Sequence, residues 1–221
     1  MASQLQNFHV PIHTPRLTLI PFDPANDTHC NFFYELYNDR EVLLATADVQ
    51  TQVPDRETAR RIVGESQVNQ LRIGLGRFIV TLNAPSSHST STPSSSEEEK
   101  TEREPEPVFV GSVGLKLRRP LGPTVPDIGF SLLRLYWGQG YATEACTALL
   151  EYFQKEKGVK DVLGYCSPAN ENSKKMFRRL GFEHRGVRML NGLGGEGIVM
   201  GALVWAKPGM DSDLGSYGIG E

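Results

Sequence analysis

The chain has 221 residues, enough for one large domain, and its 39% hydrophobic and 22% charged residues are ordinary for a globular protein and exclude a fully disordered one. Its three cysteines are widely spaced and match neither a disulfide ladder nor a zinc site, which favours a reducing compartment. We find no signal-like start and no apolar run near the roughly 18 residues of a membrane span. We therefore expect a cytoplasmic protein, with the nucleus as the alternative.

The formal net charge of −3 is concentrated in one segment. Residues 83–107 hold six glutamates and only two basic residues, so the rest of the chain is close to neutral. This balance predicts no polyanion-binding surface, and we expect no membrane partner and no direct contact with nucleic acid.

The first half of the chain alternates strand and helix. A strand over residues 16–21 precedes a helix capped by Asp27 or Thr28, and a second helix begins after Asp55. The candidate core positions of this second helix are Ile62, Val63 and Val68. Between the two helices, residues 40–53 have no regular pattern, so we expect irregular structure there.

Residues 84–107 are rich in Ser, Thr, Pro and Glu and contain no apolar residue that could anchor them. Such a segment cannot bury enough surface to offset its ordering entropy, so it predicts a disordered insert. Strand patterns flank it at residues 77–82 and 108–117, which makes it an enlarged hairpin loop. A phosphorylated regulatory loop is the alternative.

The second half continues the alternation. We expect a strand at 127–133, a helix at 143–156 ended by Gly158, a strand at 161–166, and a helix from about Asn172 to Leu180 ended by Gly181. An antiparallel pair at 182–190 and 198–205 closes the domain. The pattern predicts a single α/β (α+β) domain over residues 1–207 with a mixed sheet, followed by a flexible tail at 208–221.

The glycine loop Trp137–Ala142 lies between the expected strand and a helix. Glycines let a chain turn so that the unpaired N–H groups of a helix start converge on an anion, which predicts a phosphate or pyrophosphate site. The loop lacks the Gly-Lys-Ser/Thr of a Walker A motif and the third glycine of a dinucleotide fingerprint. This motif alone leaves two other interpretations possible: a packing turn that binds no ligand, and a nucleotide site of another kind.

A second motif, Ser167–Phe182, follows in the sequence SPANENSKKMFRRLGF. Together the two motifs resemble the GNAT acetyltransferase superfamily, with its Gln/Arg-x-x-Gly-x-Gly/Ala loop, later Asn-x-x-Ser/Ala and Gly-Phe pair. The resemblance is strongest to the branch that includes the ribosomal-protein N-terminal acetyltransferases. Three segments carry it: YWGQGYATEA, the opening TPRLTLIPF and the LNG at residues 190–192. The resemblance runs from about Thr14 to Trp205.

This resemblance implies a mixed, mostly antiparallel sheet with a central V-shaped splay, flanked by helices. Acetyl-CoA enters the V as co-substrate, and no metal is implied. The pantetheine arm would pair with the strand backbone, the pyrophosphate would meet the loop amides, and the thioester would face Asn170 and Ser173. The implied cofactor-binding residues are Phe130, Leu132, Leu133, Trp137, Gly138, Gln139, Gly140, Tyr141, Ala142, Thr143, Asn170 and Ser173.

Two departures from the family pattern bear on catalysis. Trp137 replaces the usual Gln or Arg, at small expected cost because backbone amides carry the pyrophosphate. Phe177 stands where many relatives have a tyrosine that protonates the leaving thiolate, so Ser173 or water must serve, or the thiolate leaves unassisted. Ser173 is therefore the catalytic candidate. The candidate bases are Asp127, Glu144, His184 and Glu196, and none of them is singled out.

The resulting prediction is an enzyme that moves an acetyl group from acetyl-CoA to a primary amine, on a protein N-terminus or a small molecule, by direct attack. The alternative is a CoA-binding module with weak or no turnover. The partners are acetyl-CoA and the amine acceptor, and the chain is a monomer or a homodimer. We expect Gly140→Val to abolish CoA binding while the ligand-free protein melts almost normally.

Overall fold

The computed structural model describes residues 10–46, 52–84, 106–118, 123–191, 193 and 199–220. The described strands are β1 (Ile12–His13), β2 (Leu17–Pro21), β3 (Arg77–Leu82), β4 (Phe109–Lys116), β5 (Asp127–Leu132), β6 (Leu163–Cys166), β7 (Glu183–Asn191) and β8 (Val199–Ala206). The helices are α1 (Asp27–Asn38), α2 (Arg40–Thr46), α3 (Arg56–Ile73), α4 (Tyr141–Lys157) and α5 (Glu171–Arg179), with short 3-10 turns η2 (Arg134–Tyr136) and η3 (Leu214–Tyr217).

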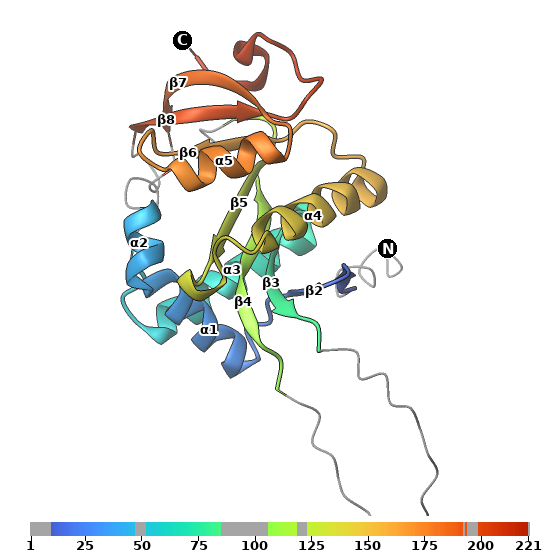
Figure 1. Cartoon of the computed structure of the whole chain (residues 1–221), viewed down its shortest axis with the longest axis vertical. Helices are drawn as coiled ribbons and strands as arrows, with labels where there is room; N and C mark the ends of the chain where they lie inside the picture. The colour runs from blue at the N-terminus through green and yellow to red at the C-terminus, as the bar shows by residue number, and fades with distance from the viewer. Residues whose placement is uncertain are drawn as a thin grey trace, which may run out of the picture.

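These strands form one sheet in the order β1-β2-β3-β4-β5-β6-β8-β7 (Figure 1). All neighbours are antiparallel except β5 and β6, which are joined through α4 and run parallel, as a helical crossover requires. The expected mixed, mostly antiparallel sheet flanked by helices is therefore confirmed, and so is the antiparallel pairing of β7 with β8.

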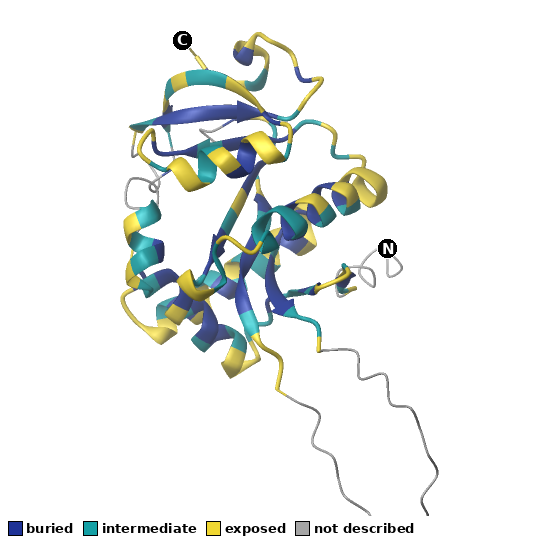
Figure 2. Cartoon of the chain, viewed as in Figure 1, coloured by how far each residue is buried: buried dark blue, intermediate teal, exposed yellow. Residues whose placement is uncertain are grey.

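Helices cover both faces of this sheet, because successive side chains along a strand point to opposite faces and apolar side chains occur on both. Along β3, Phe78 and Val80 pack in a cluster with α4 and α5, whereas Ile79 points to the other face and packs with α1 and α3. Figure 2 shows the buried stripes of the helices turned toward the strands. Apolar residues at helical spacing, such as Leu149 and Phe153, form the core face of α4.

The first helix boundaries differ slightly from expectation. The cap of α1 is Asn26, whose side chain accepts from the backbone N–H groups of Thr28 and His29. Asp55 caps α3 as expected, and Val63 is buried, but Val68 is 61% exposed because it lies on the solvent side of that helix.

Two stretches expected to be irregular are ordered instead. Helix α2 occupies residues 40–46, where Asp39 caps the backbone N–H of Val42 and the Val42 side chain is buried. The C-terminal segment, expected to be flexible, packs Met210, Leu214 and Ile219 into a cluster with β6 and β8. Three isolated apolar residues in a glycine-rich stretch gave no periodic signal, and only the sheet surface makes them a core.

The insert expected at 84–107 lies almost wholly outside the described residues. Its two ends are adjacent, because the backbone N–H of Leu82 donates to the carbonyl of Val108 at 3.0 Å. The described flanks therefore fit a hairpin connection between β3 and β4.

Candidate active site

The sheet splits between β5 and β6. Within β5, only Asp127 and Ile128 pair with β6, so the rest of β5 has no strand partner on that side. Backbone groups alternate along a strand: the carbonyl of Pro126 accepts from Leu163 on the β6 side, and the N–H of Leu133 donates to Val110 on the β4 side. The backbone of Phe130 and the N–H of Leu132 therefore face the gap, which has the V shape implied by the family resemblance.

The glycine loop stands directly beside this gap. Gly138 and Gly140 have φ of 76° and 82°, a region that L side chains rarely adopt, and Gly140 is the N-terminal cap of α4. The first bond inside the helix runs from the N–H of Glu144 to the carbonyl of Gly140 at 3.0 Å. The amides of Tyr141, Ala142 and Thr143 thus have no helical acceptor and carry the positive end of the helix dipole.

A partly exposed ion pair holds the loop against the N-terminal strands. Arg16 binds the Glu144 carboxylate at 2.6 Å, its Nη1 donates to the carbonyl of Gln139 at 3.0 Å, and its guanidinium lies 4.7 Å from the centre of the Tyr141 ring. Thr14 donates a second hydrogen bond to Glu144 at 2.6 Å. Burial acts to raise the pKa of Glu144, but the hydrogen bonds from Thr14 and Arg16 outweigh it and hold that pKa below its ordinary value.

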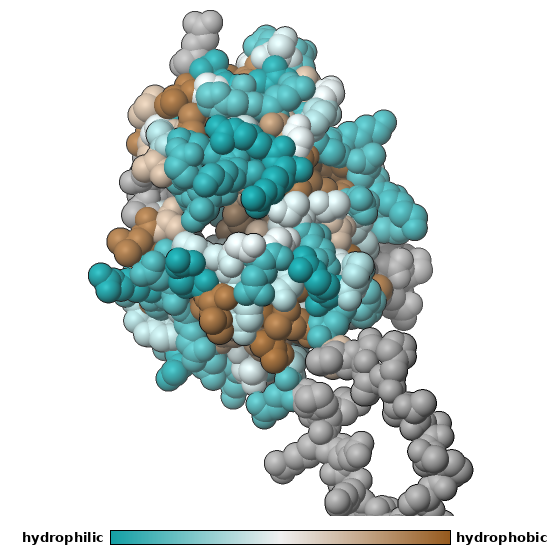
Figure 3. Space-filling view, viewed as in Figure 1, coloured by the Kyte–Doolittle hydropathy of each residue, from teal (hydrophilic) through white to brown (hydrophobic). Residues whose placement is uncertain are grey.

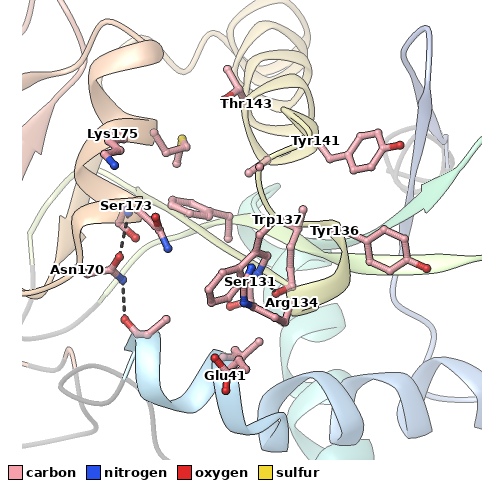
Figure 4. Close-up of a pocket in the computed structure, with 18 of the residues that line it drawn as sticks. Glu41, Ser131, Arg134, Tyr136, Trp137, Tyr141, Thr143, Asn170, Ser173 and Lys175 are labelled. Carbon is pink, nitrogen blue, oxygen red and sulfur yellow. Dashed lines mark hydrogen bonds between the residues drawn. The ribbon is translucent and has the colours of Figure 1, made fainter.

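A cavity of about 550 Å³ occupies the gap and extends over the glycine loop, a size typical of small-molecule sites (Figure 4). Figure 3 shows the surface hollowed on this side, below α5. Ten of the twelve residues implied as cofactor-binding line it: Phe130, Leu132, Trp137, Gly138, Gly140, Tyr141, Ala142, Thr143, Asn170 and Ser173.

Two implied residues do not line the cavity. Leu133 packs beside the α1–α3 cluster because its side chain points to the opposite face from Leu132. Gln139 turns its side chain back to donate to the carbonyl of Leu135, and its own carbonyl is taken by Arg16. The loop conformation, which the motif alone does not encode, decides both orientations.

Asn170 joins two walls of the cavity. It caps α5 by accepting from the N–H of Ser173 at 2.9 Å, and its Nδ2 donates to the carbonyl of Ala45 on α2 at 2.5 Å (Figure 4). Both polar atoms of its side chain are therefore already engaged, and α2 is fastened to the start of α5. Ser173 lies in the first turn of α5 and lines the cavity.

Sequence reasoning missed four charged residues that line the cavity: Glu41, Arg134, Lys175 and Arg179. Arg134 lies over the Trp137 ring, 5.0 Å from its centre, while the indole Nε1 donates to the carbonyl of Leu132 at 2.6 Å. The neighbouring loop and Asn170 motifs could have indicated Arg134, Lys175 and Arg179. No local signal marks Glu41, because α2 reaches the cavity only through the tertiary fold.

The three candidate bases that the structure describes lie in different environments, and none of these three lines the cavity. Asp127 is 4% exposed and bound to Arg118 at 2.6 Å, and Glu144 is held by Arg16. His184 packs against Trp205, with ring centres 5.1 Å apart. Glu196 lies outside the described residues.

Phe177 is fully buried and does not line the cavity. Its ring stacks on Trp205 with centres 5.6 Å apart and meets Phe130 edge-on at 5.9 Å. It is therefore part of the core under the gap, and Met176 presents the side chain next to the cavity instead.

Within the described part of the chain, no group of three or more His, Cys, Asp or Glu side chains could hold a metal ion. Among the helices that the structure describes, we find none with both the length and the apolar character of a membrane span.

Comparison with curated proteins finds partial relatives. An uncharacterized N-acetyltransferase of Schizosaccharomyces pombe is 35% identical over 91 residues, 40% of this chain and 48% of that protein. An uncharacterized protein of Bacillus subtilis is 30% identical over 76 residues, 34% of this chain and 44% of that protein. The matched part spans less than half of either relative.

Solved structures share the fold along most of the chain. The Salmonella typhimurium acetyltransferase that modifies the N-terminal serine of ribosomal protein L7/L12 has a TM-score of 0.65 at 16% identity, covering 89% of this chain and 98% of that one. The microcin C7 self-immunity acetyltransferase, solved with acetyl-CoA and AMP, has a TM-score of 0.65 at 14% identity, covering 93% and 98%. Residues 16–183 match the family model of the acetyltransferase (GNAT) domain, and this chain therefore belongs to the GNAT acetyltransferase family.

Proposed function

We propose that the protein is an N-acetyltransferase that moves the acetyl group of acetyl-CoA to a primary amine. The observation that carries the proposal is the open side of β5 next to the unpaired amides of the α4 N-terminus, both facing one cavity. A strand edge can pair with the amide-bearing pantetheine arm, and helix-start amides suit a pyrophosphate.

The charges of the cavity support the same ligand. Arg134, Lys175 and Arg179 line it, and cationic side chains favour the phosphates of CoA. The amides of Tyr141–Thr143 would hold the pyrophosphate, and the backbone of Phe130 and the N–H of Leu132 would hold the pantetheine arm. The solved microcin acetyltransferase, which contains acetyl-CoA, has the same fold.

The chemistry needs mainly positioning. A neutral amine attacks the thioester carbon, the N–H of Leu132 or Phe130 is available to the oxyanion, and the C–S bond then breaks. The Ser173 hydroxyl lines the cavity and can protonate the leaving thiolate, a role that the buried Phe177 cannot fill. The acceptor is a protein N-terminus, as for the solved acetyltransferase that modifies ribosomal protein L7/L12, or a small amine. We place the reaction in the cytoplasm. The active species is a monomer or a homodimer.

Incubation of the protein with acetyl-CoA and a panel of N-terminal peptides, polyamines and amino acids tests this activity. Release of free CoA above the hydrolysis background, with the acetylated amine identified by mass spectrometry, is the expected result. The panel includes a peptide beginning with serine, because one solved relative modifies such a terminus. Failure of every acceptor while CoA still binds tightly would instead favour a CoA-binding module without turnover, the second candidate that Phe177 motivates.

The role of Ser173 is tested by Ser173→Ala. If the hydroxyl protonates the thiolate, kcat should fall about 100-fold while the KM for acetyl-CoA changes little. Ser66→Ala on α3, outside this cavity, is the matched control. An unchanged kcat would mean that water protonates the thiolate or that it leaves unassisted.

A further inference from the structure

The charges that line the cavity are of two kinds. Three are cationic and suit a CoA molecule, but Glu41 is the one carboxylate among the described lining residues. A carboxylate beside the phosphates of CoA would oppose binding. The carboxylate of Glu41 therefore fits a positively charged group of the bound substrates, away from the phosphates of CoA.

The position of α2 fits that requirement. Glu41 lies in the first turn of α2, on the side of the close-up view opposite Thr143 and Lys175 (Figure 4). Ala45 is four residues later, so the two residues share one face of the helix, and both line the cavity. Because the Ala45 carbonyl binds Asn170, this face is fastened to the turn that carries Ser173.

The rest of α2 keeps this face in place. Val42, next to Glu41, is 2% exposed and anchors the helix in the α1–α3 cluster. Glu41 itself is half-buried, and no described basic side chain lies within ion-pair distance of its carboxylate. An acidic residue in a first helical turn is common as a simple favourable charge, but such a residue usually faces solvent rather than a ligand-sized cavity.

We propose that Glu41 binds the ammonium group of the acceptor and accepts its proton before attack. The proposal rests on the function proposed above and names the acceptor class as a cationic primary amine. The ammonium transfers one proton to the carboxylate, and the neutral nitrogen forms the new C–N bond. The C–S bond breaks with its electron pair on sulfur, and the second nitrogen proton passes to the thiolate by way of Ser173 or water. The protonated Glu41 then returns its proton to solvent.

Two synthetic CoA derivatives test the proposal without knowledge of the natural acceptor. One carries a 3-aminopropyl chain on sulfur and the other an n-butyl chain of equal length, so they differ in an ammonium group near the acceptor position. The wild-type protein should bind the amino derivative about tenfold more tightly by titration calorimetry. Glu41→Gln should bind both equally, with an unchanged affinity for the butyl derivative that also reports an intact fold.

Two further variants complete the design. Glu35→Gln removes an exposed carboxylate from α1, outside the cavity, and should keep the wild-type preference. Glu41→Asp retains the charge and should keep most of the preference, so that it also decides the case if Glu41→Gln fails to fold. With the acceptor that the panel identifies, Glu41→Gln should lower kcat/KM about 100-fold at neutral pH.

The outcomes separate the two proposals. Equal binding of both derivatives by the wild-type protein, or an unchanged preference in Glu41→Gln, overturns the role of Glu41 and leaves the acetyltransferase activity intact. If the wild-type protein binds neither derivative nor acetyl-CoA, the proposed function itself fails, and the role of Glu41 fails with it.

Discussion

Thr143 lies in the first turn of α4, where it lines the cavity beside the unpaired amides. Thr143→Glu should weaken CoA binding at least about tenfold, because the new carboxylate repels the pyrophosphate. The fold should not suffer, since an acidic residue in a first helical turn interacts favourably with the helix dipole. Calorimetric titration with CoA, together with a melting curve of the ligand-free protein, checks both parts.

Thr143→Gln is the matched control, since it has the same shape without the charge. The difference in affinity between the two variants should shrink at high salt, where the repulsion is screened. Equal affinities of Thr143→Glu and the wild-type protein would place the pyrophosphate elsewhere.

Substitution of Gly140 is a less specific test of the pyrophosphate site than the sequence motif suggests. Its φ of 82° strains any side chain, and a Cβ there would lie 3.4 Å from Nη2 of Arg16. Gly140→Val should therefore destabilise the ligand-free protein as well. This backbone conformation corrects the expectation of almost normal melting.

At the scale of elements, the ion pair between Arg16 and Glu144 ties the start of β2 to α4. The lowered pKa of Glu144 means that the folded protein binds its proton less readily than the unfolded chain. The stabilisation is therefore present above the unfolded pKa of about 4.3 and is lost as the pH falls through the lower folded pKa.

Glu144→Gln should lower the free energy of unfolding at neutral pH by about 1 kcal/mol. Between about pH 5 and 3, the wild-type protein should lose stability more steeply than this variant. Urea denaturation across that range measures both effects. Glu151→Gln, on the exposed face of α4, should retain the wild-type slope, and a parallel slope for Glu144→Gln would argue against this pair as a source of acid sensitivity.

The contact between β6 and α5 depends on a missing side chain. A Cβ on Gly164 would overlap the Phe177 ring, which is fully buried and stacked on Trp205. Gly164→Ala should therefore lower the free energy of unfolding by about 1–3 kcal/mol, as overpacking does in other cores. Chemical denaturation measures the change.

The control is Gly129→Ala on β5, where nothing lies within 4 Å of the new Cβ, and it should change the free energy of unfolding little. Equal stabilities of the two variants would show that the ring has room to shift.

At the scale of the whole molecule, deletion of residues 86–104 should leave the fold and CoA binding nearly unchanged. The flanking strands already meet through the hydrogen bond between Leu82 and Val108, and a shorter loop changes closure entropy by only about 1 kcal/mol or less. Melting temperature and CoA affinity of the deletion variant check this. A fall of many degrees would mean that the insert packs on the domain.

The sequence by itself determined most of the secondary-structure elements and the cofactor-binding side of the candidate site. The residue patterns placed α3, α4, β3 and the β7–β8 pair, although Val68, an expected core position of α3, is exposed. The glycine loop and the Asn170 motif led to the family, and ten of the twelve residues they implied line one cavity. These are contiguous motifs, in which the chemistry and the local backbone are encoded together.

The tertiary structure alone decided the other half. Helix α2 is too short to show a period, and Glu41 comes to the cavity only because Val42 is buried and Asn170 holds Ala45 from 125 residues away. The engagement of Glu144 by Arg16, and the packing of Met210 and Leu214, likewise depend on partners remote in the chain. Contacts of this kind follow from how the sheet and its helices assemble, and no local pattern of residues records them.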